Sequence, residues 1–206
     1  MYVPSIEDKE FRCKVQAFLR HDETTREWDV KLNELGHLVQ GWEYSYVLAP
    51  ETPKDGCLTA WGAYEPKVPF MHRAILHVAH PVFRSFMRKA FKTSSTEIQA
   101  RRLKMIEEIL DEVDKVLKKQ KYLAGESLSH VDITFSSLLA PMMPARLVWA
   151  PQSLYAKGRF TSFHGAMSRM VDIWPRPLSE WEQRLSQRPC AQHAIRLYEE
   201  FRSRQL

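Results

Sequence analysis

Apolar side chains recur every three or four residues along most of the chain, and this spacing predicts helices. The first long stripe follows a 4-3-4-3-4 rhythm through Trp28, Leu32, Leu35, Val39, Trp42 and Tyr46. Because this rhythm puts these side chains on one face, we expect an amphipathic helix with that face in the core. Pro50 and Pro53 predict its end, since proline cannot continue the helical hydrogen bonding.

The segment after this helix is rich in proline. Residues 50–70 predict a long loop, and loops of this length in compact domains are uncommon enough to indicate function or mobility. Beyond the loop we expect a short helix at residues 71–80 and another at residues 81–92, separated at Pro81.

The clearest helix in the chain begins near residue 94. Ser94 and Glu97 have the spacing of an N-terminal capping box, in which each side chain binds a backbone N–H at the helix start. Its apolar stripe consists of Leu103, Ile106, Leu110, Val113 and Leu117. Helical patterns follow at residues 167–174, 178–187 and 189–202. The core positions expected in the last of them are Ile195, Leu197, Tyr198 and Phe201.

These patterns predict an all-α fold, a bundle of roughly six to nine helices, because alternation typical of strands is almost absent. The 206 residues, 44 % of them hydrophobic, suffice for one sizeable core. We expect a charged N-terminal helical arm at residues 1–27 and a helical domain at residues 28–206.

Composition excludes several classes of function. The chain has 7 glycines and no glycine-rich phosphate motif, which argues against a nucleotide-binding fold. Its net charge of +5 comes with no nucleic-acid-binding motif, and its basic cluster at residues 101–104 is followed by acidic positions, as on a solvated helix face. Nucleic acid is therefore not an expected partner, although acidic ligands or partners stay open.

Cysteine and histidine spacing gives no sign of a metal or disulfide site. Cys13, Cys57 and Cys190 are far apart, so we expect reduced thiols in a reducing compartment. His72, His77 and His80 do not follow a standard ligand pattern, and we expect no metal site. No apolar run is long enough for a membrane span and the first residues do not resemble a signal peptide, so we expect a soluble chain.

Two polar residues precede the most apolar helix pattern. Ser129 and Asp132 have capping-box spacing, and Leu128 and Ile133 occupy the positions of a hydrophobic staple. Ser129, His130 and Asp132 are also the residue types of a hydrolase triad, but in one helical turn these side chains diverge around the axis. We therefore expect these residues to start a buried helix and assign no catalytic residue to the chain.

The stretch KYLAGESLSHVDITFSSLLAP, residues 121–141, resembles the capping region of the C-terminal helical domain of glutathione S-transferases. Its matching positions are Tyr122, Leu123, Gly125, Leu128, Ser129, Asp132 and Ile133, while Val131 departs from the usual alanine. Residues 33–50 and 185–202 are similar to the first and closing helices of that domain. The resemblance implies the all-helical fold over most of the chain.

Family enzymes bind glutathione mainly on a thioredoxin-like N-terminal domain, which supplies a Tyr, Ser or Cys near the thiol and a cis-proline. The residues before position 28 are too few for such a domain. Tyr2, Ser5 and Cys13 are of the right types, but their surroundings do not fit, and Pro69 comes after the first long helix rather than before it. The resemblance therefore implies no required cofactor, with glutathione as the one to test.

Three functions remain open. The first is a binding or assembly module that docks on another protein chain or forms a homodimer. The alternative is a glutathione transferase-like enzyme whose thiol site is atypical or supplied by another chain, so catalytic activity is undecided. The third is a carrier of a hydrophobic ligand or pigment. Family resemblance places the pocket for such a ligand around His37, Trp42 and Tyr46.

Overall fold

The computed structural model describes residues 9–61, 63, 68–143 and 176–202, and this part of the chain contains helices and no strand. The α-helices are α1 (Lys9–Phe18), α2 (Glu23–Val47), α3 (Lys54–Ala60), α4 (Phe70–Ala90), α5 (Thr96–Leu117), α6 (His130–Leu139), α10 (Arg176–Ser186) and α11 (Pro189–Leu197). A 3₁₀ turn, η1 (Ala140–Met142), follows α6, and a π-helical turn, η3 (Tyr198–Arg202), follows α11. The predicted all-α fold is confirmed.

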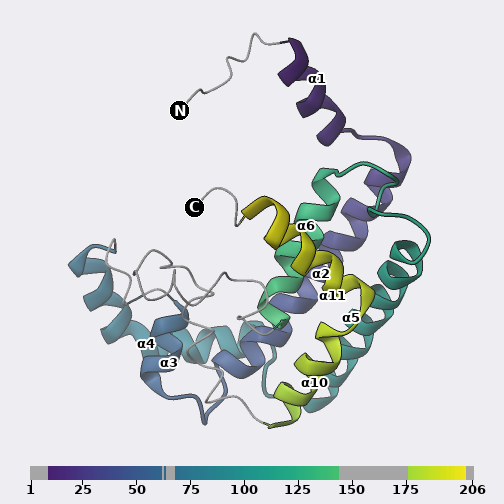
Figure 1. The fold of residues 1–206 in the computed structure, drawn as a ribbon. Coiled ribbons are helices and arrows are strands. Elements are labelled where there is room, and N and C mark those ends of the chain that lie inside the picture. Colours follow the sequence, from purple (N-terminus) through teal and green to yellow (C-terminus); the bar gives the residue numbers. More distant parts are fainter. Residues whose placement is uncertain (1–8, 62, 64–67, 144–175, 203–206) are drawn as a thin grey trace.

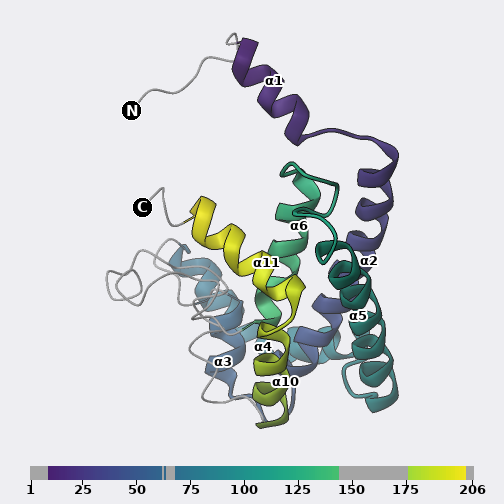
Figure 2. The same cartoon turned by 45° about the vertical axis from the view of Figure 1, so that its right-hand side comes forward.

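Helices α2, α5, α6 and α11 pack together around one hydrophobic core (Figures 1 and 2). The predicted stripe of α2 lies in this core, with Leu35 fully buried and Tyr46 half-buried against it. In α5, the buried stripe residues are Ile106, Leu110 and Val113, and Ile109 joins them. The 3.6-residue period of each helix therefore determines which face is buried.

The connection between α5 and α6, residues 118–129, contains a tight turn. Tyr122 and Gly125 form an isolated bridge through two backbone hydrogen bonds of 3.0 and 3.2 Å. Gly125 has φ of +119°, a conformation that side chains with a Cβ rarely adopt. This requirement explains why a glycine stands in the motif before the capping box.

Several predicted boundaries differ from the structure. Helix α2 begins at Glu23 after the N-cap Asp22, so the predicted domain boundary between residues 27 and 28 falls inside a helix. The division into two domains stays a prediction. Residues 54–60 of the expected loop form α3, and the helix predicted at residues 167–174 lies outside the described residues. Phe201, expected in the core, is 44 % exposed.

Helix α4 is continuous through Pro81, contrary to the prediction of two helices. Proline removes one helical hydrogen bond, but contacts on both sides of it hold the helix. The ring of His80 lies 5.8 Å from that of Trp61, and the side chain of Arg84 bonds to the segment after α2. Tertiary contacts thus offset the lost hydrogen bond.

Candidate functional site

Helix α4 turns an apolar face outward. Its exposed apolar side chains are Phe70, Met71, Ile75, Val78, Val82, Phe83 and Phe86. Met71, Ile75, Val78, Val82 and Phe86 follow a 4-3-4-4 spacing and so form one stripe along the helix. Val78 is 83 % exposed and Val82 73 %, whereas His80 is the buried residue of this helix. We call this stripe the α4 apolar face.

Polar side chains on the opposite side of α4 anchor the helix. The guanidinium of Arg84 donates to the carbonyl oxygens of Leu48 at 3.4 Å and Thr52 at 2.9 Å, and also to that of Ala49. His80 is 4 % exposed, and its Nε2 has no hydrogen-bond partner in the described part of the chain. Burial, together with the positive charges of Arg84 and Lys54 and with His77, lowers the pKa of His80. The inward side of α4 thus carries Arg84 and His80 together with Met87, which packs against Val47, Leu48 and Cys57, while the apolar stripe stays exposed.

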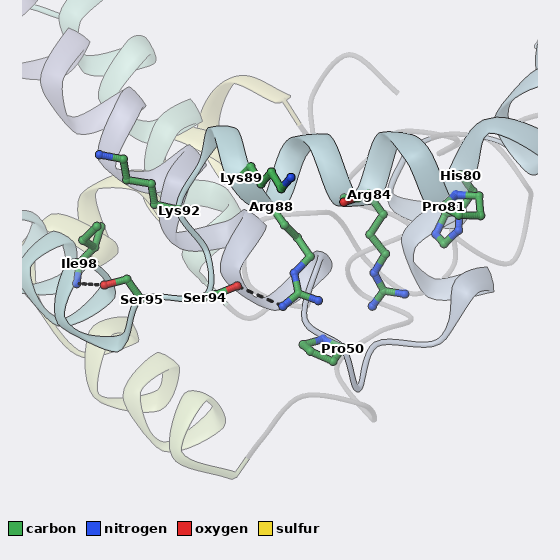
Figure 3. A pocket seen from close by; sticks show the side chains of 11 residues that line it. Pro50, His80, Pro81, Arg84, Arg88, Lys89, Lys92, Ser94, Ser95 and Ile98 are labelled. Carbon is green, nitrogen blue, oxygen red and sulfur yellow. Dashed lines mark hydrogen bonds between the residues drawn. The ribbon is translucent and has the colours of Figure 1, made fainter.

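A basic hollow of about 960 Å³ lies where α4 ends and α5 begins (Figure 3). Arg84 and Arg88 extend from α4 toward Pro50, and Ser94 and Ser95 come from the start of α5. Lys89 and Lys92 also line it, and none of its lining residues is acidic. Together with the positive end of the α5 dipole, these side chains make the hollow attractive to anionic groups.

The serines of this hollow correct one sequence prediction. Ser95, not Ser94, is the N-cap of α5, and its Oγ accepts from the backbone N–H of Ile98 at 3.3 Å. Ser94 Oγ instead accepts from Arg88 at 3.1 Å. Because the helix begins one residue later than predicted, Glu97 is not at the capping-box position of this N-cap.

The ligand pocket predicted from His37, Trp42 and Tyr46 is not gathered in one place. Trp42 is buried in the core, with its ring 5.1 Å from that of Tyr46 and 5.5 Å from that of Trp181. His37 is exposed and lines a separate hollow of about 660 Å³ between α2 and α6, which neither aromatic residue lines. A ligand role of the three residues stays a prediction.

Glu43 also lines the hollow between α2 and α6. It is 8 % exposed, and its Oε1 has no hydrogen-bond partner among the described residues. Burial raises the pKa of Glu43 to about 8, because the ionised carboxylate would lose its hydration. Sequence patterns did not single out this residue, since it occupies an ordinary polar position of an amphipathic helix.

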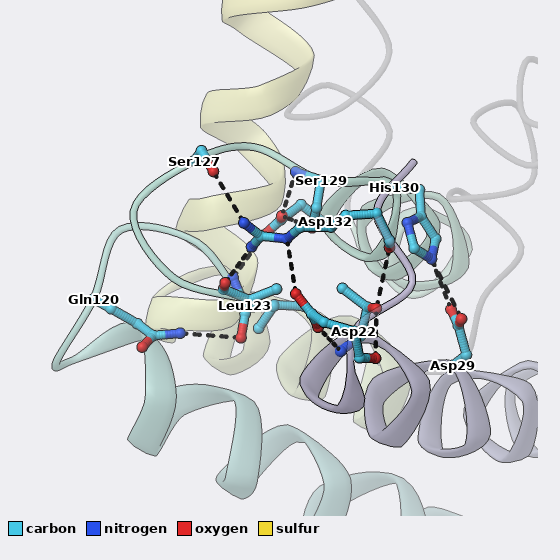
Figure 4. Close-up of polar contacts among 11 residues, drawn as sticks. Asp22, Asp29, Gln120, Leu123, Ser127, Ser129, His130 and Asp132 are labelled. Carbon is cyan, nitrogen blue, oxygen red and sulfur yellow. Dashed lines mark hydrogen bonds and ion pairs between the residues drawn. The ribbon is translucent and has the colours of Figure 1, made fainter. Parts of the chain in front are cut away.

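The capping box at the start of α6 is present. The Oδ2 of Asp132 accepts from the backbone N–H of Ser129 at 3.0 Å and from its hydroxyl at 2.8 Å. Its Oδ1 accepts from the N–H of Leu123 at 2.8 Å (Figure 4). The same oxygen lies 3.1 Å from Nε2 of His193. Asp132 is thus fully buried and ties the preceding turn, α6 and α11 together.

The two residues of the predicted hydrophobic staple, Leu128 and Ile133, are only partly buried. Leu128 is half-buried and Ile133 is 38 % exposed. A packing role of this pair therefore stays a prediction.

The cysteines in the described part of the chain are free thiols. Burial raises the pKa of Cys57 to about 11 and also raises that of Cys190, so neither is a ready thiolate at neutral pH. Among the described residues, no helix has both the length and the hydropathy that a membrane span requires.

The α4 apolar face was not predicted, although the sequence carries a signal for it. Residues 66–96 contain no Asp or Glu but include Arg73, Arg84, Arg88, Lys89 and Lys92. Such a segment combines an apolar stripe with charge of one sign. For this segment the sequence pattern predicted helices but no exposed or buried face, because periodicity does not show which side of a helix faces the protein.

Comparison with protein families gives one match. Residues 75–161 match the model of the glutathione S-transferase C-terminal domain, and residues 144–161 of this match lie outside the described part. No curated protein and no solved structure matches the chain significantly. The match confirms the resemblance expected from the sequence. The matched range includes α5, α6 and α4 from Ile75 onward.

Proposed function

Because residues 75–161 match a glutathione S-transferase C-terminal domain and α4 turns its apolar face outward, we propose that the chain is a binding module that docks on another protein through α4. The α4 apolar face carries this proposal. Fully burying such a side chain contributes roughly 1.5–3 kcal/mol, so covering this face gives a strong drive for association.

Charge complementarity indicates the chemistry of the partner. Apart from Arg84, which anchors the helix to the protein, the Arg and Lys side chains of α4 are Arg73, Arg88 and Lys89, and the helix carries no acidic residue. The basic hollow adjoins the end of this helix. A partner that covers the apolar face therefore needs an apolar strip flanked by Asp or Glu side chains.

A second copy of this chain fits the face less well. Pairing α4 with α4 would bring two basic helices together, which is unfavourable. Several acidic side chains of α5 already form ion pairs within the chain: Glu108 with Lys104 at 3.8 Å, Asp111 with Arg188 at 2.6 Å, and Glu112 with Lys31. We therefore propose a different, acidic partner chain.

Affinity purification from the native cells, with tagged wild-type chain and with the Val78→Glu/Val82→Glu double variant, tests this function. We expect a stoichiometric partner with an acidic binding surface to co-purify with the wild type and to be lost from the double variant. Val30→Glu is the matched control, because Val30 is a valine 72 % exposed on α2. This control should keep the partner.

A photo-crosslinking residue at position 78 shows whether the α4 apolar face is covered by a partner chain, by a second copy or by the same chain. Crosslinks to an acidic partner chain, weakened by salt, support the proposal. Crosslinks to a second copy, or to residues of the same chain, would overturn it. Binding of the purified chain to anionic phospholipid vesicles, lost in the double variant, would also overturn it in favour of a membrane surface.

The hollow between α2 and α6 supports a second candidate, the binding of a small ligand by a transferase-like enzyme or a carrier. Its volume of about 660 Å³ lies in the range of small-molecule sites. Conjugation of a generic electrophile, or a higher Tm with glutathione, would support the enzyme. A co-purifying chromophore or lipid would support the carrier. Absence of all three would exclude this candidate.

A further inference from the structure

Two histidines and an aspartate from distant parts of the sequence meet at the start of the bundle. His21 lies in the turn before α2, Asp29 lies on α2, and His130 is the first residue of α6. Nε2 of His130 is 3.1 Å from Oδ1 of Asp29 and 3.3 Å from Oδ2 (Figure 4). The rings of His21 and His130 are 5.3 Å apart.

One ligand atom from each of these side chains lies within 4.8 Å of the others. Imidazole nitrogen and carboxylate oxygen bind Zn²⁺ at about 2.0–2.2 Å, which places neighbouring ligand atoms of a tetrahedral ion about 3.3 Å apart. The pair formed by His130 and Asp29 already has this separation. His21 is exposed, so its side chain can complete the set by a rotamer change.

No arginine or lysine in the described part of the chain is paired with Asp29, so its carboxylate is available to bind a cation. Within the described residues, His130 is the only ion-pair partner of Asp29. The nearby Arg20 is engaged elsewhere: its Nε lies 3.4 Å from Asp22, and its guanidinium donates to Ala124 and Ser127. An incoming cation would therefore replace a histidine–carboxylate contact and would not have to displace an arginine or lysine from Asp29.

We propose that His21, Asp29 and His130 form a site for a divalent transition-metal ion of the Zn²⁺ type. The fourth position is open to water, as in zinc sites with three protein ligands. Nδ1 of His130 is buried without a hydrogen-bond partner in the described chain, so it lacks the support that metal-binding histidines usually have. The site therefore binds more weakly than closed structural zinc sites.

A bound ion would hold the turn between α1 and α2 against the start of α6. Helix α1 projects away from the other helices in both views (Figures 1 and 2). The turn after it is otherwise fixed through Arg20 and Thr25, whose hydroxyl donates to the Arg20 carbonyl at 3.1 Å. The ion would thus restrain the direction in which α1 leaves the bundle.

Calorimetric titration of the full chain with Zn²⁺ alone, after treatment with a chelator, tests the proposal. We expect one ion per chain in the wild type and at least about tenfold weaker binding in His21→Gln and in Asp29→Asn. His37→Gln, an exposed histidine of α2 outside the cluster, is the matched control and should bind like the wild type.

Two further measurements separate a built site from surface binding. With Co²⁺, a tetrahedral site gives intense visible absorption, which His21→Gln should lose. Zn²⁺ should also slow hydrogen exchange in the turn between α1 and α2 of the wild type but not of His21→Gln. Wild-type stoichiometry below one ion, or affinity unchanged in His21→Gln and Asp29→Asn, would overturn the proposal.

Discussion

Asp132 shows how one buried carboxylate can organise a helix start. Burial by itself would raise its pKa, but hydrogen bonds from His193, Leu123 and Ser129 outweigh this effect and hold the pKa below the ordinary value of 3.8. The ionised form is therefore favoured in the folded state. The stability that this ionised group contributes is present above pH 3.8 and is lost as the pH falls through the lowered folded pKa.

The hydrogen bonds of Asp132 lead to a test by substitution. Asp132→Ala leaves the N–H groups of Leu123 and Ser129 buried without acceptors, so we expect a loss of about 3–5 kcal/mol in the free energy of unfolding. Ser129→Ala should cost only about 1 kcal/mol, because the carboxylate keeps its other donors. Urea denaturation of both variants checks this. Equal losses would contradict the central role of Asp132.

The pKa of Glu43 is shifted in the opposite direction to that of Asp132, so its effect on stability has the opposite pH dependence. Its pKa rises from 4.5 to about 8 on folding, so the folded state binds more protons than the unfolded state between these values, and stability falls as the pH rises through this range. Glu43→Gln removes the titrating group. We expect wild type and variant to be similar near pH 4.5, and the variant to be more stable by a few kcal/mol above pH 8. Denaturation of both proteins at several pH values between 4.5 and 9 checks this. A difference in the free energy of unfolding that stays the same across this range would contradict it.

At the scale of the helix, α4 and α5 show where periodicity succeeds and where it is insufficient. The apolar stripe of α5 was predicted correctly because charged residues occupy its other face. In α4, the apolar positions recur with the same helical spacing, but the structure leaves them exposed. Two predicted boundaries were also wrong: α4 continues through Pro81, and the N-cap of α5 is Ser95 rather than Ser94.

The start of α5 can be tested with two neighbouring serines. Ser95→Ala removes the acceptor for the N–H of Ile98 and should destabilise the protein by about 1 kcal/mol. Ser94→Ala removes an exposed contact with Arg88 and should cost less than about 0.5 kcal/mol. Thermal or urea denaturation measures both. The reverse order would support the helix start predicted from the sequence.

At the scale of the whole molecule, Arg188 links α11 to α5. Its guanidinium donates to Asp114 at 2.8 Å, to Asp111 at 2.6 Å and to Glu107, and Asp114 also accepts from the N–H of Cys190 at 2.8 Å. The Arg188 side chain is 20 % exposed, so water screens the network only in part. This network fixes the closing helix on the bundle.

We expect Arg188→Ala to lower the free energy of unfolding by about 2–3 kcal/mol, since Asp114 loses a half-buried partner. Lys104→Ala is the matched control, because it breaks an exposed pair with Glu108 and should cost no more than about 0.5 kcal/mol. Urea denaturation at low salt compares the two variants. A loss as small as that of the control would show that the network contributes little.

Most of the fold was predictable from local patterns. The stripe of α2, the stripe of α5 and the capping box of α6 follow from residues that are close in sequence. The candidate sites were not predictable in the same way. Trp42, predicted to line a pocket, is buried in the core, and the spacing of His21, Asp29 and His130 in the sequence does not show that they meet.

The sequence by itself determined the helical class, the buried faces of α2 and α5, the buried start of α6, and the resemblance of the segment around Asp132 to a glutathione S-transferase C-terminal domain. Each of these depends on residues within a few turns of one another. Only the tertiary structure decided that α4 faces outward and that His21 and Asp29 meet His130, about a hundred positions away. Periodicity is a property of one helix. Exposure and the meeting of distant side chains depend on how helices pack against one another.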